Sequence, residues 1–167
     1  MIDWSAIGSA AIGGVLALAG GLLVYGWQAR EEKIALREAL KSEISSIVML
    51  IETRKFDELI ESELKAMKDD PNYQPRFKLY GSDPPWNWPI YEQNAGAIGK
   101  VGEALSGDIV RFYTLLRSVQ VDMAEITGGR MKDRTDVKKV LEEDLAIWRT
   151  QIRPAANRIA APTPSPP

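Results

Sequence analysis

The stretch "DIVRFYTLLRSVQVDMAEIT", residues 108–127, carries a regular helical pattern. Its apolar side chains recur at alternating steps of three and four residues, which is the spacing of one face of an α-helix. Because other amphipathic segments lie in the same short chain, we expect this face to pack against them in a small helical bundle or hairpin. The predicted helix–helix interface consists of Ile109, Phe112, Leu116, Val119, Met123 and Ile126.

Two flanking segments repeat this periodicity. Residues 31–68 contain no Pro or Gly, and their apolar side chains predict one long amphipathic helix. Its face is expected to comprise Leu36, Leu40, Ile44, Ile47 and Ile51, followed by Phe56, Ile60, Leu64 and Met67. After a polar turn at Gly128 and Gly129, the last helix has an apolar face of Val137, Leu141, Leu145, Trp148 and Ile152.

Local signals predict where the shorter elements begin and end. A short helix over residues 90–98 is expected to stop at Gly99 in a left-handed conformation. Ser106 is expected to cap the helix that follows, and Thr135 the last helix. Pro154 should end or kink that last helix, because its ring clashes with regular helical geometry.

Residues 71–89 form a long connection that is rich in proline and aromatic residues. A loop of more than about 12–15 residues is usually functional or disordered, and this one is too aromatic for a disordered spacer. Its aromatic side chains either pack over the bundle, which we favour, or form a surface for a partner. The candidates for a partner surface are Trp86 and Trp88. The closing residues 161–167 are proline-rich and predict an extended tail.

The N-terminal stretch "WSAIGSAAIGGVLALAGGLLVYGWQAR", residues 4–30, has no ionisable side chain before Arg30. It exceeds the roughly 20 apolar residues that a helix needs to cross a bilayer, which predicts a transmembrane helix. Trp4 at one end and Tyr25 and Trp27 at the other suit the two headgroup regions of a membrane.

Two other interpretations of this stretch remain open. It could be an export leader cleaved after Ala19, although basic residues do not precede it, or a buried helix of a soluble protein, although its glycines would weaken such a helix. As a span, it would have its N-terminus outside and the rest of the chain in the cytoplasm, because basic residues follow it directly. These residues are Arg30, Lys33, Arg37 and Lys41.

Small residues recur at steps of four along one face of the predicted span. Such a stripe allows two helices to approach closely in lipid, so it predicts association with a second copy or with another membrane protein. In a segment rich in Gly and Ala the spacing could also arise by chance. The stripe consists of Ser9, Gly13, Ala17 and Gly21.

Composition excludes several classes of function. The 21 Lys and Arg residues are balanced by 23 Asp and Glu residues, so we expect no nucleic-acid partner. Without Cys or His, the chain cannot form a Ser-His-Asp triad, a thiolate nucleophile or the usual zinc sites. The sequence therefore predicts no catalytic residue, metal site or cofactor.

The stretch "PIYEQNAGAIGKVGEALSGDIVRFYTLL", residues 89–116, resembles small single-pass bacterial and prophage membrane proteins of unknown function. The resemblance also covers the overall layout, in which a span and a long charged helix precede this stretch. It implies a location in a membrane and no established activity.

The sequence as a whole predicts an all-α protein. We expect an anchor (1–29), a long membrane-proximal helix (30–70), the aromatic loop (71–89), a helical region completing the bundle (90–160) and a tail (161–167). The expected function is a bacterial inner-membrane interaction or assembly module without catalysis. Two alternatives are a membrane-permeabilising, phage- or toxin-like protein, and an enzyme or enzyme accessory subunit at the membrane.

Overall fold

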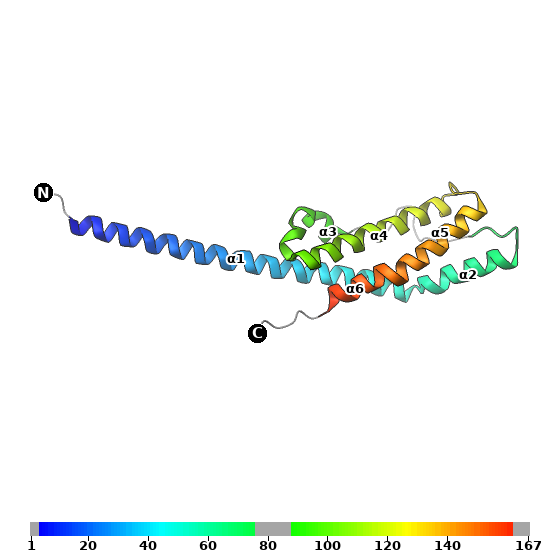
Figure 1. Cartoon of the computed structure of the whole chain (residues 1–167), viewed down its shortest axis with the longest axis horizontal. Coiled ribbons are helices and arrows are strands. Elements are labelled where there is room, and N and C mark those ends of the chain that lie inside the picture. Colours follow the sequence, from blue (N-terminus) through cyan, green and yellow to red (C-terminus); the bar gives the residue numbers. More distant parts are fainter. Residues whose placement is uncertain (1–3, 76–87, 162–167) are drawn as a thin grey trace. The chain divides into compact units, whose positions relative to one another are not determined.

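All residues that the structure describes lie in helices or in the turns between them, which confirms the all-α class. The computed structural model describes residues 4–75 and 88–161, with side chains described at residue 21 and from residue 24 onward within those ranges. The elements, in chain order, are α1 (Trp4–Thr53), α2 (Phe56–Asp69), α3 (Pro89–Asn94), the 3-10 helix η1 (Ala95–Val101), α4 (Glu103–Thr127), α5 (Arg134–Ile147), the π-helical turn η2 (Trp148–Ile152) and α6 (Arg153–Ala160) (Figure 1).

The chain divides into two compact units, Met1–Glu38 and Ala39–Pro167. The second unit is a helical bundle in which α4 packs against α5, η2 and α6, while α2 packs against α5. In Figure 1, α4 runs alongside the α5–α6 segment, and α2 lies beside α5. The last part of α1 contributes its own buried residues to this unit, namely Leu40, Ile44, Ile47 and Ile51.

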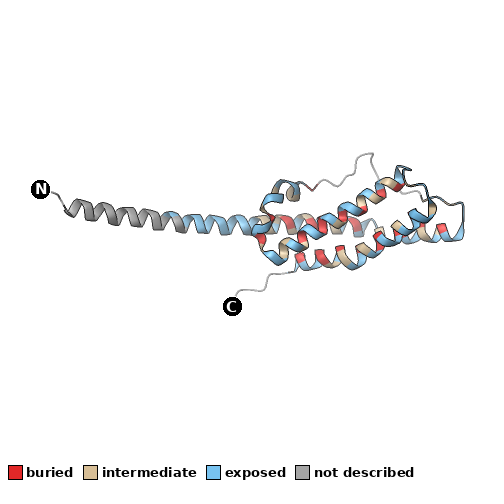
Figure 2. Ribbon diagram, turned by 45° about the horizontal axis from the view of Figure 1, so that its top comes forward, coloured by how far each residue is buried: buried red, intermediate tan, exposed pale blue. Residues whose placement is uncertain are grey.

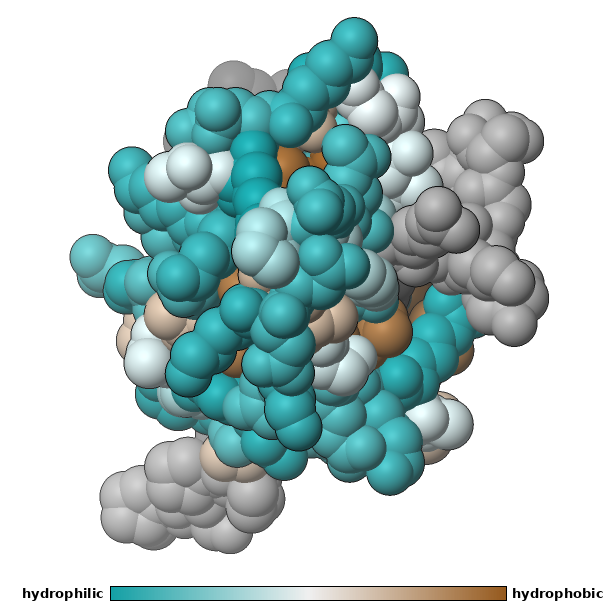
Figure 3. Space-filling view, turned by 90° about the vertical axis from the view of Figure 1, so that its right-hand side faces the viewer, coloured by the Kyte–Doolittle hydropathy of each residue, from teal (hydrophilic) through white to brown (hydrophobic). Residues whose placement is uncertain are grey.

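The core of the bundle is built from apolar helix faces. All six residues of the interface on α4 are buried, and so are the five apolar residues along α5 and η2 that the periodicity placed on one face. In Figure 2 the buried positions lie on the sides of the helices that face one another. Seen from the end at which α4 and α5 are joined, the surface is mainly hydrophilic (Figure 3). Burial of these faces supplies the main driving force for folding.

The prediction of one helix over residues 31–68 is wrong, because the helix is interrupted after Thr53. Lys55 adopts left-handed backbone angles (φ 52°, ψ 47°), and α2 begins at the next residue. This conformation costs a non-glycine residue about 1–2 kcal/mol. Packing helps to offset the cost, since the ring of Phe56 at the start of α2 meets Trp148 edge-on, with 6.5 Å between the centroids.

The predicted boundaries on either side of η1 are also wrong. Gly99 does not stop the short helix in a left-handed conformation but lies inside η1. The positive φ, 109°, occurs instead at Gly102, directly before α4. Only glycine adopts such angles without steric cost. Ser106 lies inside α4, where its hydroxyl donates to the carbonyl of Glu103 at 2.9 Å, so it is not the N-cap.

The start of α5 differs from expectation as well, and of the two expected effects of Pro154 the end of the helix does not occur. Asp133, not Thr135, caps α5, because its carboxylate accepts from the backbone N–H groups of Thr135 and Asp136 at 2.8 and 3.1 Å. Pro154 does not end the helical segment. Instead, hydrogen bonding changes to the wider π spacing over Trp148–Ile152, and Pro154 then occupies the first turn of α6, where a missing N–H is tolerated.

The predicted transmembrane span, with its stripe of small residues, lies in a segment of α1 that the structure describes only in part. Among the residues that the structure describes, none of the helices is long and apolar enough to cross a membrane. The surroundings of Ser9, Gly13 and Ala17 lie outside the described part of the chain, and so does Trp86. Gly21 is exposed, and a Cβ atom there would meet no other atom within 4 Å. The transmembrane anchor and the helix-pairing stripe therefore stay predictions.

Candidate functional site

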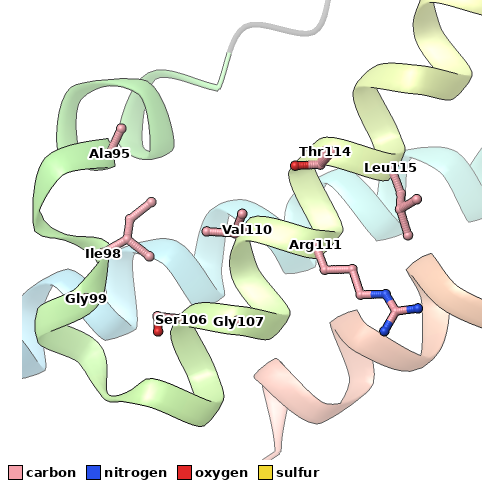
Figure 4. A pocket seen from close by; sticks show the side chains of 9 residues that line it. All are labelled: Ala95, Ile98, Gly99, Ser106, Gly107, Val110, Arg111, Thr114 and Leu115. Carbon is pink, nitrogen blue, oxygen red and sulfur yellow. The ribbon is translucent and has the colours of Figure 1, made fainter.

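An open groove lies between η1 and α4 on the surface of the bundle (Figure 4). Its volume is about 560 Å³. In Figure 4, Ile98 of η1 lies opposite Val110 of α4, and Arg111 extends away from the groove. The groove is lined by Ala95, Ile98, Gly99, Ser106, Gly107, Val110, Arg111, Thr114 and Leu115.

The groove exists because small residues line it. A Cβ atom at Gly99 or Gly107 would meet no other atom within 4 Å, so these positions leave space that no side chain fills. Arg111 donates to the side-chain oxygen of Gln151 at 2.9 Å, which directs its charge towards η2. The lining includes hydroxyl groups and apolar side chains but no carboxylate that could activate a nucleophile. The groove is therefore a shallow, mainly apolar surface.

Glu43 of α1 accepts three hydrogen bonds from α3 and α4, the helices that precede and follow η1 in the chain. The backbone N–H groups of Ile90 and Tyr91 donate to its carboxylate at 2.9 and 3.1 Å, and the hydroxyl of Tyr113 donates at 2.5 Å. The first turn of a helix has N–H groups without partners inside the helix, and no side chain of the preceding Trp88 caps α3. Glu43 therefore caps α3 from a helix far away in sequence.

Aromatic rings pack around this carboxylate. Tyr91 of α3 stacks on Tyr113 of α4 with 3.9 Å between the centroids, and Trp88 lies 5.3 Å from Tyr113. Burial and the hydrogen bond to Glu43 raise the pKa of Tyr113 far above its ordinary value, so its hydroxyl remains a donor. We call Glu43, Trp88, Tyr91 and Tyr113 the aromatic clasp. It joins α1, α3 and α4 and thereby positions η1, which follows α3 directly.

The prediction that Trp88 belongs to a partner surface is wrong. Trp88 was a candidate for contact with a partner, but only 2% of it is exposed. It packs inside the bundle because Tyr113 offers it an aromatic neighbour, which agrees with the interpretation that we favoured for the aromatic loop. Trp86 lies outside the described residues and stays a candidate.

Arginines of the last helical segment pair with carboxylates on three other helices. Arg149 contacts Glu61 of α2 at 2.6 Å, Arg153 contacts Glu52 of α1 at 2.9 Å, and Arg158 contacts Asp108 of α4 at 2.6 Å. The last pair is bidentate, because Nε of Arg158 also donates to Asp108 at 2.9 Å. Because these pairs are exposed to solvent, each adds little to the free energy of unfolding.

The sequence patterns located the core but missed the polar residues that the fold brings together. Neither Glu43 nor Tyr113 stood out, because their contact joins residues that are 70 positions apart. Asp144 was also missed, although it lies within the apolar face of α5, next to Leu145, and that position is a signal of burial. Among the described residues, no group of three or more potential ligands could hold a metal ion.

No protein-family model, characterised protein or solved structure matches this chain.

Proposed function

We propose that this chain is a membrane-anchored helical interaction or assembly module without catalysis of its own. The anchor is the N-terminal part of α1, and the helical bundle is the part that binds a partner. The proposed location is a bacterial inner membrane, with the N-terminus outside and the bundle in the cytoplasm.

The uncharged run of residues 4–29 carries this proposal. It belongs to α1, and near its end the helix exposes Val24, Tyr25 and Trp27 by 54%, 73% and 65%. Large apolar side chains gathered on a surface favour contact with a partner or with lipid, and Tyr and Trp favour the headgroup region. Basic residues follow from Arg30 onward, which supports the cytoplasmic side for the rest of the chain.

The groove between η1 and α4 supports a binding role for the bundle. Its lining is mostly apolar, and Val110 within it is exposed to solvent. The absence of His and Cys from the sequence removes the commonest catalytic side chains. Binding of a protein partner through a shallow surface needs neither of them.

Membrane fractionation tests the anchor. We expect the full chain to sediment with membranes and to resist extraction at high pH, whereas the double variant Leu16→Arg/Leu18→Arg should appear in the soluble fraction. The control is Met49→Arg, which adds charge at an exposed position of the same helix and should stay with the membranes. A wild-type chain that is soluble from the start would overturn the proposal.

Reporter fusions after Pro167 test the orientation. A fluorescent protein should be active there and a periplasmic phosphatase inactive. An active phosphatase would reverse the topology, and a mature N-terminus near residue 20 would identify the run as a cleaved leader.

Substitutions in the stripe of small residues distinguish self-association from binding of a different protein. Gly13→Ile fills the stripe and should abolish self-association in a membrane two-hybrid assay, whereas Leu16→Ile should not. If Gly13→Ile instead removes a co-purifying protein, the stripe binds a different helix. Leakage of a dye from cells on expression would favour the membrane-permeabilising alternative, and co-purification with an enzyme would favour the role of an accessory subunit.

A further inference from the structure

Asp144 is an acidic residue inside the core of the bundle. It is 1% exposed, and its Oδ2 atom has no hydrogen-bond partner. It lies on the face of α5 that also carries the buried Leu141, Leu145 and Trp148. A carboxylate in such surroundings is strongly disfavoured relative to the neutral acid, because no donor replaces the water that its Oδ2 atom loses.

The charges around Asp144 do not compensate for this burial. Asp122 of α4 and Glu143 of α5 act on it as like charges. The pKa of Asp122 is itself raised, first by its own burial and then by Glu143 and Glu125. Burial and these neighbours raise the pKa of Asp144 to about 7.

Several cations on α5 and on neighbouring elements pair with other carboxylates. On α5, Lys139 pairs with Glu143 at 3.8 Å. On α2, Asp57 and Glu61 both pair with Arg149 of η2. Beyond α4, Arg130 pairs with Glu125 at 2.7 Å. The remaining acidic group on the inner side of α2, Glu63, accepts from the hydroxyl of Tyr73 at 2.9 Å.

We propose that Asp144 makes the α4–α5 hairpin a pH-sensitive device, which is closed while this carboxyl is protonated and opens as the carboxyl ionises. Opening lets α5 turn its carboxylate towards water. The inference is independent of the proposed membrane anchor, because all the groups involved lie in the bundle.

The backbone on both sides of Asp144 is suited to such a movement. The turn that joins α4 to α5 contains Gly128 and Gly129, of which Gly129 has a φ of 66°. On the other side, the π-helical turn η2 begins at Trp148, four residues after Asp144. Single π turns within helices often mark places where a helix adjusts for function. The indole Nε1 of Trp148 is also buried without a partner, so hydrogen bonding is incomplete at this point.

The expected size of the effect follows from proton linkage. The carboxyl titrates at about 7 in the closed hairpin and near its ordinary value of 3.8 once it is solvated. Ionisation in the open form then increases the open population by about 30-fold between pH 5.5 and pH 8.

Hydrogen exchange on the full chain in non-ionic detergent tests this proposal. After correction for the intrinsic dependence of exchange on pH, the amides of α5 should open about 30-fold more often at pH 8 than at pH 5.5. The isosteric variant Asp144→Asn should remove this dependence. The matched control is Glu142→Gln, which neutralises an exposed carboxylate on the same helix and should behave like the wild type.

Carbon NMR of the Asp144 carboxyl in the wild-type chain gives a second measurement that needs no variant. A titration midpoint near 7 supports the proposal, and a midpoint near 4 overturns it. Equal exchange of α5 at both pH values in the wild type, or the same increase in Asp144→Asn, would also overturn it.

Discussion

Glu43 and Asp144 are both acidic residues between helices of the same bundle, but the structure surrounds them differently. The carboxylate of Glu43 receives two backbone N–H groups and a tyrosine hydroxyl. Asp144 is more deeply buried, its Oδ2 has no partner, and its charged neighbours are acidic. Hydrogen-bond donors therefore decide whether an inward-facing carboxylate stabilises or destabilises the contact between helices. Urea unfolding of the full chain in detergent, followed by circular dichroism, measures this difference.

A new carboxylate placed among apolar side chains should cause the largest loss. Met123 lies on the buried face of α4 and is 3% exposed. Met123→Asp should lower the free energy of unfolding by at least about 5 kcal/mol, which is enough to unfold a marginally stable bundle. The matched control is Val121→Asp, because Val121 lies on the same helix and is 52% exposed. Equal losses at the two positions would show that the helix face is assigned wrongly.

Removal of the well-paired carboxylate should cause the next largest loss. Glu43→Ala leaves two backbone N–H groups of α3 and the hydroxyl of Tyr113 without an acceptor. We expect the free energy of unfolding to fall by about 4 kcal/mol. Glu43→Gln keeps one acceptor oxygen and should lose clearly less. Equal stability of the wild type and Glu43→Ala would show that the aromatic clasp does not join the helices.

Asp144 should make stability depend on pH in the opposite sense to an ordinary salt-bridged carboxylate. Its pKa in the folded chain, about 7, lies above the ordinary value of 3.8, so the folded state holds the proton more tightly than the unfolded state. The corresponding stability is complete below about pH 4 and is lost as pH rises through 7. Between pH 5 and pH 8 the wild type should lose about 3 kcal/mol.

The variant Asp144→Asn isolates this contribution. It should be less dependent on pH over this range and more stable than the wild type at pH 8. A variant that loses as much stability as the wild type between pH 5 and pH 8 would assign the dependence to another group.

Removal of a single donor should have the smallest effect. Tyr113→Phe keeps the ring that stacks on Tyr91 at 3.9 Å but removes the hydroxyl that donates to Glu43. The expected loss is about 1–2 kcal/mol, the value of one hydrogen bond to a charged group. Tyr91→Phe is the control, and it should leave the free energy of unfolding nearly unchanged. If only Tyr91→Phe lowers the free energy of unfolding, the hydroxyl of Tyr91 and not that of Tyr113 stabilises the bundle.

Much of the fold follows from the sequence by itself. The step of three and four residues from Ile109 to Ile126 identifies α4 and its buried face, and the same rule finds the inner side of α5 and η2. Gly128 and Gly129 mark the end of α4, because glycine supplies the left-handed geometry at no steric cost. These features depend on neighbours within one or two helical turns, so the local sequence contains the information that determines them.

Only the tertiary structure decides the break at Lys55, the role of Glu43 and the isolation of Asp144. Lys55 adopts unfavourable angles that its own sequence gives no reason to expect, and the packing of α2 against α5, together with the contact of Phe56 with Trp148, stabilises them. The chain contains 23 acidic residues, and nothing within a few positions of Glu43 shows that it will cap α3 and bind Tyr113. Donors that come from other helices depend on the register in which those helices pack. That register is set by the whole core, because a carboxylate gains or loses its partners only when distant faces are brought together.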